Sequence, residues 1–323
     1  MKLLKHLLLL SLALSLCLLA VSCNNAGGGK SGKPKIAVIP KGTSHNFWLS
    51  IKAGADAAGQ ELGAEILWKG PAQETDYTGQ VNIVEDFVNK QVDGIVLAPS
   101  SGDALVTPAK KAKAANIPVV VIDSGINWEE YTAYISTDNR KGGVIAAKRM
   151  GEILNGKGKV GIIGVKKGSI STDEREEGFI ETIKKEFPNI QLLQLLYGEA
   201  DRAKSLSVAE DIITKNPDLN GIFASNESSA VGALRAINVK AVQGKVKLVG
   251  FDSSPDLVTA VKAGIIDSLV VQDPYKMGYE GVRAVLNQKA GKPVERRMDT
   301  GVELVTKDNL DTAQIQNLIK ERK

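Results

Sequence analysis

The sequence is poor in the residues that carry out redox, thiol and metal chemistry. Its 323 residues include two cysteines, Cys17 and Cys23, and two histidines, His6 and His45. Both cysteines lie at the start of the chain, so its body offers no thiol for a nucleophile, a zinc–thiolate site, an Fe–S cluster or a disulfide. One histidine beyond the start excludes a histidine-rich metal site. We therefore expect no metal and no cofactor.

An excess of charge of one sign is also lacking. The chain has 41 Lys and Arg against 37 Asp and Glu, a net charge of +4. Removal of Lys2 and Lys5 with a cleaved leader would leave 39 basic residues against 37 acidic ones. The two signs are interspersed, so no nucleic-acid-binding face is predicted.

The first residues have the pattern of an export signal. Lys2 and Lys5 form a basic segment, and an apolar stretch of about 15 residues follows, the length of a signal sequence and short for a membrane span. Ser22 before Cys23 predicts a signal peptide over residues 1–22 and a lipidated cysteine at the new N-terminus. The alternative is an ordinary cleaved signal that happens to contain a cysteine. Residues 23–33, rich in Gly and Asn, predict a flexible linker, so we expect an extracytoplasmic protein that meets the membrane only through lipid.

The remaining chain alternates short β-branched runs with longer amphipathic segments, which predicts parallel sheets covered by helices on both faces. Expected strands are 35–39, 64–68, 94–98, 119–122, 160–164, 191–196, 221–224, 247–250 and 268–271, with a short strand at 134–135. Expected helices are 47–62, 78–89, 104–115, 141–154, 172–186, 203–215, 228–237, 255–263 and 276–290, with Ser171 and Glu174 as a capping box. The series restarts at Val160, and about 290 residues suffice for two domains. We predict an α/β protein with two doubly wound parallel-sheet lobes.

Polar side chains follow nearly every expected strand. Ligands of open α/β sheets bind outside the carboxyl ends of the strands. Each polar residue alone is an ordinary turn or helix-cap residue, but their repeated placement at one edge indicates a ligand site. The segments are Lys41–Trp48, Pro99–Ser101, Asp123–Ser124, Thr137–Asn139, Asn226–Glu227, Phe251–Asp252 and Gln272–Asp273.

Two patterns suggest other functions and are set aside. Gly156–Gly161 matches G-x-G-x-x-G, but it precedes a strand, whereas a dinucleotide-binding turn follows one, so we interpret it as a turn. A hydrolase built around His45 would need a nucleophilic serine in G-x-S-x-G, which does not occur. We expect no enzyme.

From Lys35 to about Thr306 the chain resembles the ribose/galactose-type periplasmic sugar-binding proteins, the type I solute receptors of ABC transporters. The runs that carry the resemblance are Phe47–Ala55, Asn116–Asp123, Thr137–Gly143, Glu174–Phe179, Asn226 with Gly232–Ala236, and Val249–Asp252.

The resemblance implies two lobes, residues 34–137 plus 273–301 and residues 138–272 plus 302–323, joined by three crossovers near residues 137–138, 272–273 and 300–301. A monosaccharide or similar polyol would be clamped between them and delivered to an ABC permease by a monomer. Phe47 and Trp48 would pack on the sugar ring. Asp123 would accept hydrogen bonds from hydroxyls, and Arg175 would donate charge-assisted ones. The full expected set is Lys41, His45, Asn46, Phe47, Trp48, Ser101, Asp123, Ser124, Thr137, Arg175, Asn226, Phe251, Asp252 and Gln272.

Departures from the family pattern leave the ligand open. Ribose receptors carry Asn-Pro-Phe-Phe where this chain has His45-Asn46-Phe47-Trp48, and an Asp-Arg pair where this chain has Asp123-Ser124. They also carry an aromatic residue at a position that falls near Ala200 of this chain. The calcium loop of galactose receptors has no counterpart, so no metal is expected. Phe251 is equally well interpreted as a core residue. Arg175 could be a surface charge on its helix, but for Arg175, as for Asn226 and Asp252, we favour a role in the site.

Three other classes of protein are weighed against this prediction. One is the sensing half of a LacI-type repressor, which would need a helix-turn-helix where this chain has a signal sequence. A second is a receptor for a signalling molecule, such as a furanose autoinducer, that feeds a chemoreceptor or sensor kinase, and the sequence does not separate it from uptake. The third is an exported enzyme, for which the sequence has no catalytic constellation.

Overall fold

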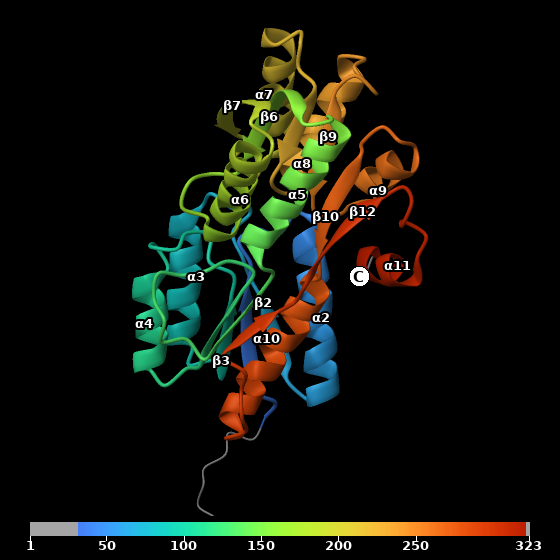
Figure 1. Cartoon of the computed structure of the whole chain (residues 1–323). Coiled ribbons are helices and arrows are strands. Elements are labelled where there is room, and N and C mark those ends of the chain that lie inside the picture. The colour runs from blue at the N-terminus through green and yellow to red at the C-terminus, as the bar shows by residue number, and fades with distance from the viewer. Residues whose placement is uncertain (1–31, 321–323) are drawn as a thin grey trace, which may run out of the picture. The chain divides into compact units, whose positions relative to one another are not determined.

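Two six-stranded sheets organise the chain in the computed structural model, which describes residues 32–320 (Figure 1). The first sheet has the order β2-β1-β3-β4-β5-β11, and all its strand pairs are parallel. Its strands are β1 (Lys35–Ile39), β2 (Glu65–Trp68), β3 (Gly94–Leu97), β4 (Val119–Ile122), β5 (Ala133–Ser136) and β11 (Arg297–Asp299).

The second sheet repeats this topology, in the order β7-β6-β8-β9-β10-β12. Its pairs are parallel except for β12, which runs antiparallel to β10. Its strands are β6 (Lys157–Gly164), β7 (Asn189–Tyr197), β8 (Gly221–Ala224), β9 (Lys247–Phe251), β10 (Ser268–Gln272) and β12 (Val302–Thr306). Both sheets reverse their strand order beside the first strand, between β1 and β3 and between β6 and β8, which is where such folds bind ligands.

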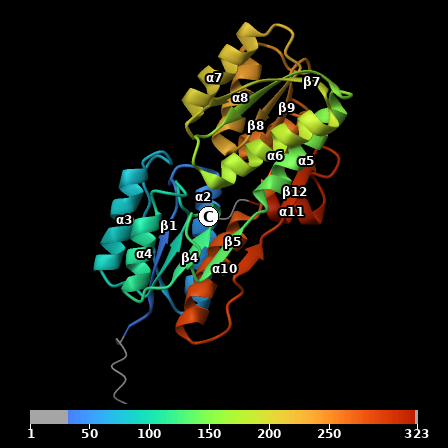
Figure 2. The ribbon, with the colours of Figure 1, turned by 60° about the vertical axis from the view of Figure 1, so that its left-hand side comes forward.

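Helices cover both faces of each sheet (Figure 2). On the first sheet, α2 (Asn46–Leu62) and α10 (Pro274–Lys289) pack on one face, and α3 (Tyr77–Asn89) and α4 (Val106–Ala114) on the other. On the second, α5 (Asn139–Ile153) and α6 (Ile170–Glu186) oppose α7 (Arg202–Lys215), α8 (Glu227–Val239), α9 (Pro255–Lys262) and α11 (Ala313–Ile319). We call the two layered units the N-terminal and C-terminal lobes. The prediction of two doubly wound lobes is confirmed.

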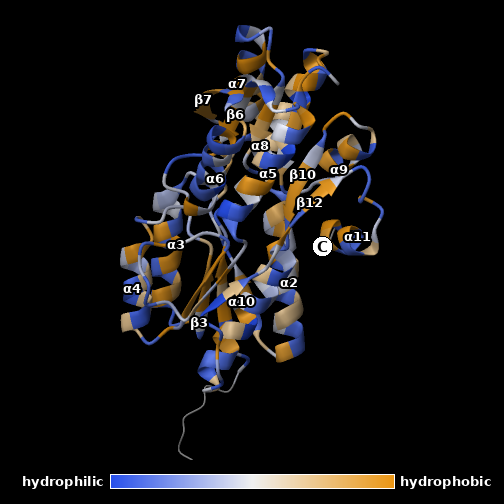
Figure 3. Ribbon diagram, viewed as in Figure 1, coloured by the Kyte–Doolittle hydropathy of each residue, from blue (hydrophilic) through white to orange (hydrophobic). Residues whose placement is uncertain are grey.

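Each central strand serves two cores because successive side chains point to opposite faces of a sheet. In β1, Ile36 and Val38 pack toward α2 and α10, whereas Ala37 and Ile39 pack toward α3 and α4. The strands are therefore almost wholly apolar and the helices are two-sided (Figure 3). Within residues 32–320, none of the helices is long and apolar enough to span a membrane.

The chain passes between the sheets at three places: from β5 to α5, from β10 to α10, and from β11 to β12. At two of these crossovers, Thr137 Oγ1 lies 3.4 Å from Thr300 Oγ1 and donates a hydrogen bond to the carbonyl oxygen of Gly301 (3.3 Å).

The expected elements all occur, with ends shifted by a few residues. The structure adds β11, β12 and α11, which we did not predict. Of the segment Gly156–Gly161, only Gly156 lies in a turn (φ 70°); the rest belongs to β6, so the turn interpretation holds for the first residue and is wrong for the others. Residues 1–31, which include the predicted signal peptide and Cys23, lie outside the described part of the chain.

Candidate ligand-binding site

A small cavity lies between the lobes, where the carboxyl ends of both sheets face each other. Its volume is about 20 Å³, room for about one water molecule. The N-terminal lobe contributes Lys41, His45, Phe47, Trp48, Glu74 and Asp123, and the C-terminal lobe contributes Ser171, Thr172, Arg175, Asn226, Glu227, Asp252 and Gln272.

The aromatic part of the wall is held in place by one carboxylate. Phe47 and Trp48 open helix α2, and their rings meet edge to face with centroids 5.0 Å apart. Trp48 Nε1 donates a hydrogen bond to Glu74 Oε1 (2.8 Å), and His45 Nδ1 lies 2.9 Å from the same oxygen. Burial alone would raise the pKa of Glu74, but the hydrogen bond and charge of His45, with the charge of Lys41, hold that pKa below its ordinary value.

The same partnership acts on His45. Burial by itself would lower the pKa of the imidazole, but the hydrogen bond and charge of Glu74, with the charge of Glu227, raise it above its ordinary value. The pair is therefore favoured in its charged form.

A buried lysine connects the lobes. Lys41 follows β1, and its Nζ forms an ion pair with Asp123 Oδ2 at 2.9 Å. The same ammonium donates hydrogen bonds across the cleft to Ser171 Oγ (3.0 Å) and Ser169 Oγ (3.2 Å). Asp123 follows β4 in a left-handed conformation (φ 62°), which aspartate adopts more readily than most residues.

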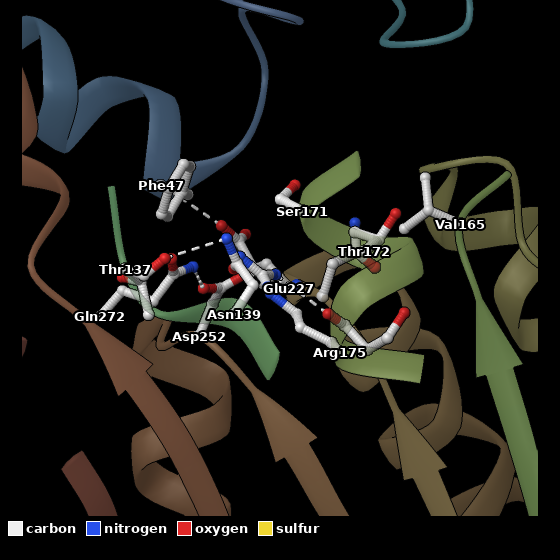
Figure 4. Close-up of polar contacts among 12 residues, drawn as sticks. Phe47, Thr137, Asn139, Val165, Ser171, Thr172, Arg175, Glu227, Asp252 and Gln272 are labelled. Carbon is white, nitrogen blue, oxygen red and sulfur yellow. Dashed lines mark hydrogen bonds and ion pairs between the residues drawn. The ribbon is translucent and has the colours of Figure 1, made fainter. Parts of the chain in front are cut away.

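Arg175 is the central donor of the C-terminal lobe (Figure 4). Its Nε donates to Asn139 Oδ1 (2.9 Å), its Nη1 donates to the carbonyl oxygen of Ser225 (3.0 Å), and its guanidinium lies 3.9 Å from the centre of the Phe251 ring. Helix packing fixes its backbone, because a Cβ on Gly143 of α5 would lie 2.1 Å from the carbonyl oxygen of Arg175. The side chain is 3% exposed, so its position is set by these contacts.

Asp252 follows β9 and is the counterpart of Asp123 in the repeated topology. It too is left-handed (φ 68°), and it accepts hydrogen bonds from Gln272 Nε2 (2.6 Å) and from the backbone N–H of Glu227 (3.0 Å). Arg175 Nη1 lies 4.0 Å from its Oδ2. Burial nevertheless outweighs these partners and raises the pKa of Asp252 to about 6.

Glu227 reaches from the C-terminal lobe to the first turn of α2. Its Oε2 accepts a hydrogen bond from the backbone N–H of Phe47 (3.0 Å), and its Oε1 pairs with Arg202 Nη2 at 2.5 Å. His45, which precedes α2, makes no side-chain cap of its own. The carboxylate therefore caps this helix from the opposite lobe, and it complements the positive end of the helix dipole.

One acceptor atom in the wall lacks a donor. Gln272 Oε1 is buried and has no hydrogen-bond partner within residues 32–320. Asp123 Oδ2 has no hydrogen bond of standard geometry either, but the Lys41 ammonium lies 2.9 Å from it and pairs with it. A buried acceptor without a donor is unfavourable by about 1–3 kcal/mol, so Gln272 Oε1 favours a ligand that carries a hydroxyl donor.

Nine of the fourteen predicted site residues line the cavity: Lys41, His45, Phe47, Trp48, Asp123, Arg175, Asn226, Asp252 and Gln272. Five do not. Asn46 lines an adjacent groove that shares Phe47, Asp252 and Gln272 with the cavity. Ser101 Oγ accepts the backbone N–H of Ala104 in a turn.

The other three predicted residues do not line the cavity but contact residues near it. Ser124 Oγ accepts the backbone N–H of Ser171 across the cleft (3.0 Å). Thr137 joins two crossovers, as described above. Phe251 is fully buried, and its ring packs against the guanidinium of Arg175. The structure therefore favours its interpretation as a core residue.

The expected set of site residues omitted four wall residues: Glu74, Ser171, Thr172 and Glu227. Glu227 was among the polar residues found by reading past each strand, but the resemblance gave it no role. Ser171 was assigned to a capping box, which is wrong: α6 begins at Ile170 after Ser169, and the Ser171 hydroxyl instead accepts the hydrogen bond from Lys41.

A two-lobed α/β protein with a polar and aromatic cavity between its lobes is built to enclose a small solute. Comparison with known proteins defines the class: residues 36–293 match the family described as periplasmic binding protein domain. The chain belongs to this family, and the predicted resemblance is confirmed. Membership implies a binding protein that works outside the cytoplasm, and it agrees with the expectation that the chain is no enzyme.

Relatives with known names are similar over most of their length. A D-ribose/D-allose-binding protein of Pseudomonas aeruginosa is 31% identical over 286 residues, which cover 85% of this chain and 89% of the relative. A solved ABC transporter solute-binding protein of Agrobacterium vitis with bound D-fucose is 40% identical, with a TM-score of 0.87 over 88% of this chain and all of the other. A carbohydrate transporter solute-binding protein of Agrobacterium radiobacter in complex with D-arabinose is 35% identical, with a TM-score of 0.88 over 90% of this chain and all of the other.

Proposed function

We propose that this protein is an extracytoplasmic receptor that clamps one neutral monosaccharide, or a similar polyol, between its lobes and delivers it to an ABC transporter permease. The observation that carries the proposal is the buried, unpaired acceptor Gln272 Oε1 in a cavity that also holds Phe47 and Trp48. Sugars present hydroxyl donors at their rims and apolar C–H groups on their faces, so both features of the wall suit them.

The charges around the cavity favour a neutral ligand. Lys41 pairs with Asp123, His45 with Glu74, Arg175 with Asp252, and Arg202 with Glu227. Four cations thus face four carboxylates, and a charged ligand would leave one of these buried groups without its partner. Uronic acids, amino sugars and sugar phosphates are therefore expected to bind far more weakly than neutral sugars.

Binding requires motion. The cavity holds about one water molecule, and its walls come from both lobes. A sugar is several times larger, so the lobes must separate to admit it and the side chains must move apart to hold it. Hinge closure at the three crossovers is the expected mode, as in other periplasmic binding proteins. The lobes of this clamp are residues 34–137 with 273–301, and 138–272 with the remainder of the chain.

Uptake is proposed over signalling because the solved relatives are described as transporter solute-binding proteins. A chemoreceptor or sensor kinase in place of the permease is the alternative. The receptor is proposed to act as a monomer, because the cavity is complete within one chain.

A thermal-shift screen tests the proposed ligand class. Neutral sugars such as D-fucose, D-arabinose, D-ribose and D-allose are compared with D-glucuronate, D-glucosamine and ribose 5-phosphate. A sugar at a thousandfold excess over its Kd should add about 4 kcal/mol to the unfolding free energy. The same sugar should reduce the radius of gyration in small-angle scattering. Stabilisation by the charged sugars alone, or an unchanged scattering profile at saturation, would contradict the proposal.

Lipid anchoring at Cys23 is proposed from the signal pattern and the linker that follows it. A thioether-linked lipid would hold the receptor near the permease. Cys23→Ala should release the protein from the membrane fraction or block its processing. If this variant sediments with membranes as the unaltered protein does, the anchor is elsewhere or absent.

A further inference from the structure

A second set of contacts joins the lobes beside the cavity. The backbone N–H of Gly102 donates to the carbonyl oxygen of Gly168 (3.1 Å), and the backbone N–H of Ser171 donates to Ser124 Oγ (3.0 Å). Gly102 and Ser124 follow strands of the N-terminal lobe, whereas Gly168 and Ser171 flank the start of α6 in the C-terminal lobe. A backbone N–H donates each of these hydrogen bonds, so the two lobes approach closely here.

Ile170 lies at the centre of this contact. It is the first residue of α6, and its side chain packs on Gly102 and Gly125 of the opposite lobe. A Cβ on Gly102 would lie 2.5 Å from Ile170 Cδ1 and 3.0 Å from Cγ1. A Cβ on Gly125 would lie 3.1 Å from Ile170 Cγ2. Two positions without side chains thus form a socket that fits this isoleucine.

The socket can accept a methyl group when the lobes are apart. Gly102 and Gly125 do not have the positive φ that would strain another residue. Within its own lobe, a Cβ on Gly102 would meet its nearest neighbour, Asn127 Nδ2, at 3.4 Å, an ordinary contact. The absence of side chains at these positions is therefore required by the approach of Ile170 and not by the fold of the N-terminal lobe.

Helix α6 couples this contact to the cavity. Ile170 is not among the residues that line the cavity, whereas its neighbours Ser171 and Thr172, and Arg175 further along the helix, are. Since one rigid helix carries all four, the movement that seats Ile170 in the socket also brings Arg175 to the ligand. An additional contact nearby, Lys166 Nζ at 4.4 Å from the centre of the Tyr77 ring, acts in the same direction.

We propose that Ile170, seated on Gly102 and Gly125, is a closure latch: it holds the lobes together without touching the ligand and so sets the affinity of the receptor. The apparent affinity for a sugar is the affinity of the closed arrangement multiplied by the fraction of molecules that adopt it. A contact that favours closure therefore raises the apparent affinity. The effect on affinity rests on the proposed function, whereas the latch itself is tested without any sugar.

The ligand-free test uses hydrogen exchange. In the unaltered protein the N–H groups of Gly102 and Ser171 should exchange more slowly than in Gly102→Ala, because the added methyl group keeps Ile170 from its socket. Gly102→Ala/Ile170→Ala should regain part of this protection. Amides in β4 and β9 serve as references for intact lobes, and the melting temperature of ligand-free Gly102→Ala should stay within a few degrees of the unaltered protein. Equal exchange at Gly102 and Ser171 in all three proteins would overturn the latch.

The second test measures sugar affinity by titration calorimetry with D-fucose and D-arabinose. Gly102→Ala should weaken binding about tenfold or more, as overpacking of a close contact does, and Gly125→Ala should weaken it less. Ile170→Ala alone should weaken it by about threefold, and the double variant should bind no more weakly than Ile170→Ala. Additive losses in the double variant would overturn the latch. If the unaltered protein binds no sugar at all, the proposed function is wrong, and the hydrogen-exchange experiment still tests whether Ile170 holds the lobes together.

Discussion

The two lobes bridge their ligand-binding edges with different chemistry. In the N-terminal lobe, the buried amide of Gln80 donates to the carbonyl oxygens of Pro40 and Ala98 (2.9 and 2.7 Å) and accepts the backbone N–H of Ser100 (2.8 Å). It thereby ties the loop after β1 to the loop after β3. In the C-terminal lobe, Glu176 Oε1 accepts the backbone N–H of Val165 (3.2 Å) and the hydroxyl of Ser225 (3.0 Å), which ties the loop after β6 to that after β8.

The pKa of a buried carboxyl group depends on whether a cationic side chain lies beside it. Burial raises the pKa of Glu176 to about 7, because Ser225 and Val165 offset only part of the desolvation. Asp252, also in the C-terminal lobe, behaves alike. Glu74 in the N-terminal lobe is also largely buried, but His45 lies beside it, and its pKa is lowered. The pKa values of Glu74 and His45 are thus shifted toward the charged forms, whereas burial raises the pKa of Asp252 in the C-terminal wall and that of Glu176, which lies outside the cavity.

Arg175→Ala should break the C-terminal wall and give the largest effect. It removes the cation beside Asp252 and the donor to Asn139 and Ser225. Removal of one partner from a buried charged network lowers the unfolding free energy by about 3–5 kcal/mol. Sugar affinity should fall by about a thousandfold, measured by titration calorimetry. Arg175→Lys keeps the positive charge but replaces the planar guanidinium, with its fixed set of N–H donors, by an ammonium. Compared with Arg175→Ala, it should restore more of the unfolding free energy than of the sugar affinity. Unimpaired binding by Arg175→Ala would show that the ligand site lies elsewhere.

Exchanging the two bridging side chains should invert the pH behaviour of the lobes. A group whose folded pKa lies above its unfolded value stabilises the fold fully below the unfolded pKa, and this contribution is lost as the pH rises through the folded pKa. For Glu176 the window runs from 4.5 to about 7. Glu176→Gln, which resembles the protonated acid, should match the unaltered protein at pH 4.5. At pH 8 it should be more stable by at most about 3 kcal/mol, at 1.36 kcal/mol per pKa unit.

The matched control is Gln80→Glu, which places a carboxyl group against the carbonyl oxygens of Pro40 and Ala98. This variant should be less stable than the unaltered protein, and more so at pH 8 than at pH 5. Urea unfolding at both pH values measures the two changes. If Glu176→Gln is destabilising at pH 8, the carboxyl of Glu176 is not held toward its neutral form.

Glu74→Gln should have the smallest effect and the narrowest pH window. Glu74 has a lowered pKa, so its contribution is present above 4.5 and is lost as the pH falls further. His45 has a raised pKa, so its contribution is present below 6.5 and is lost as the pH rises through the raised value. The loss on substitution should be about 1–2 kcal/mol and greatest between these limits, as urea unfolding at pH 5.5 and 8 can measure. A loss that is the same at both pH values would mean that the pair is not charged.

The sequence predicted the buried strands best because their β-branched runs serve two cores at once and admit few other structures. It failed for β11, whose residues are largely exposed and whose three-residue length gives no pattern. The site followed from one rule, that ligands meet the carboxyl ends of strands. Glu74 escaped it because the residue stands six positions beyond the end of β2, in a loop whose path only the fold determines. Thr137 satisfied the rule but is drawn into the crossovers by Thr300.

The crossovers also decide the order in which the lobes can fold. The N-terminal lobe begins the chain, yet Met277, Val282 and Val285 of α10 supply one of its cores, and β11 closes its sheet. Both come after the whole run from β6 to β10, which by itself supplies five of the six strands of the C-terminal sheet. Because contiguous segments fold before contacts that are distant in the sequence can form, the lobe that emerges second during export is expected to fold first. Until α10 arrives, the first half of the chain carries a sheet that only α2 covers on one face, and it is in this interval that the protein most needs protection from aggregation.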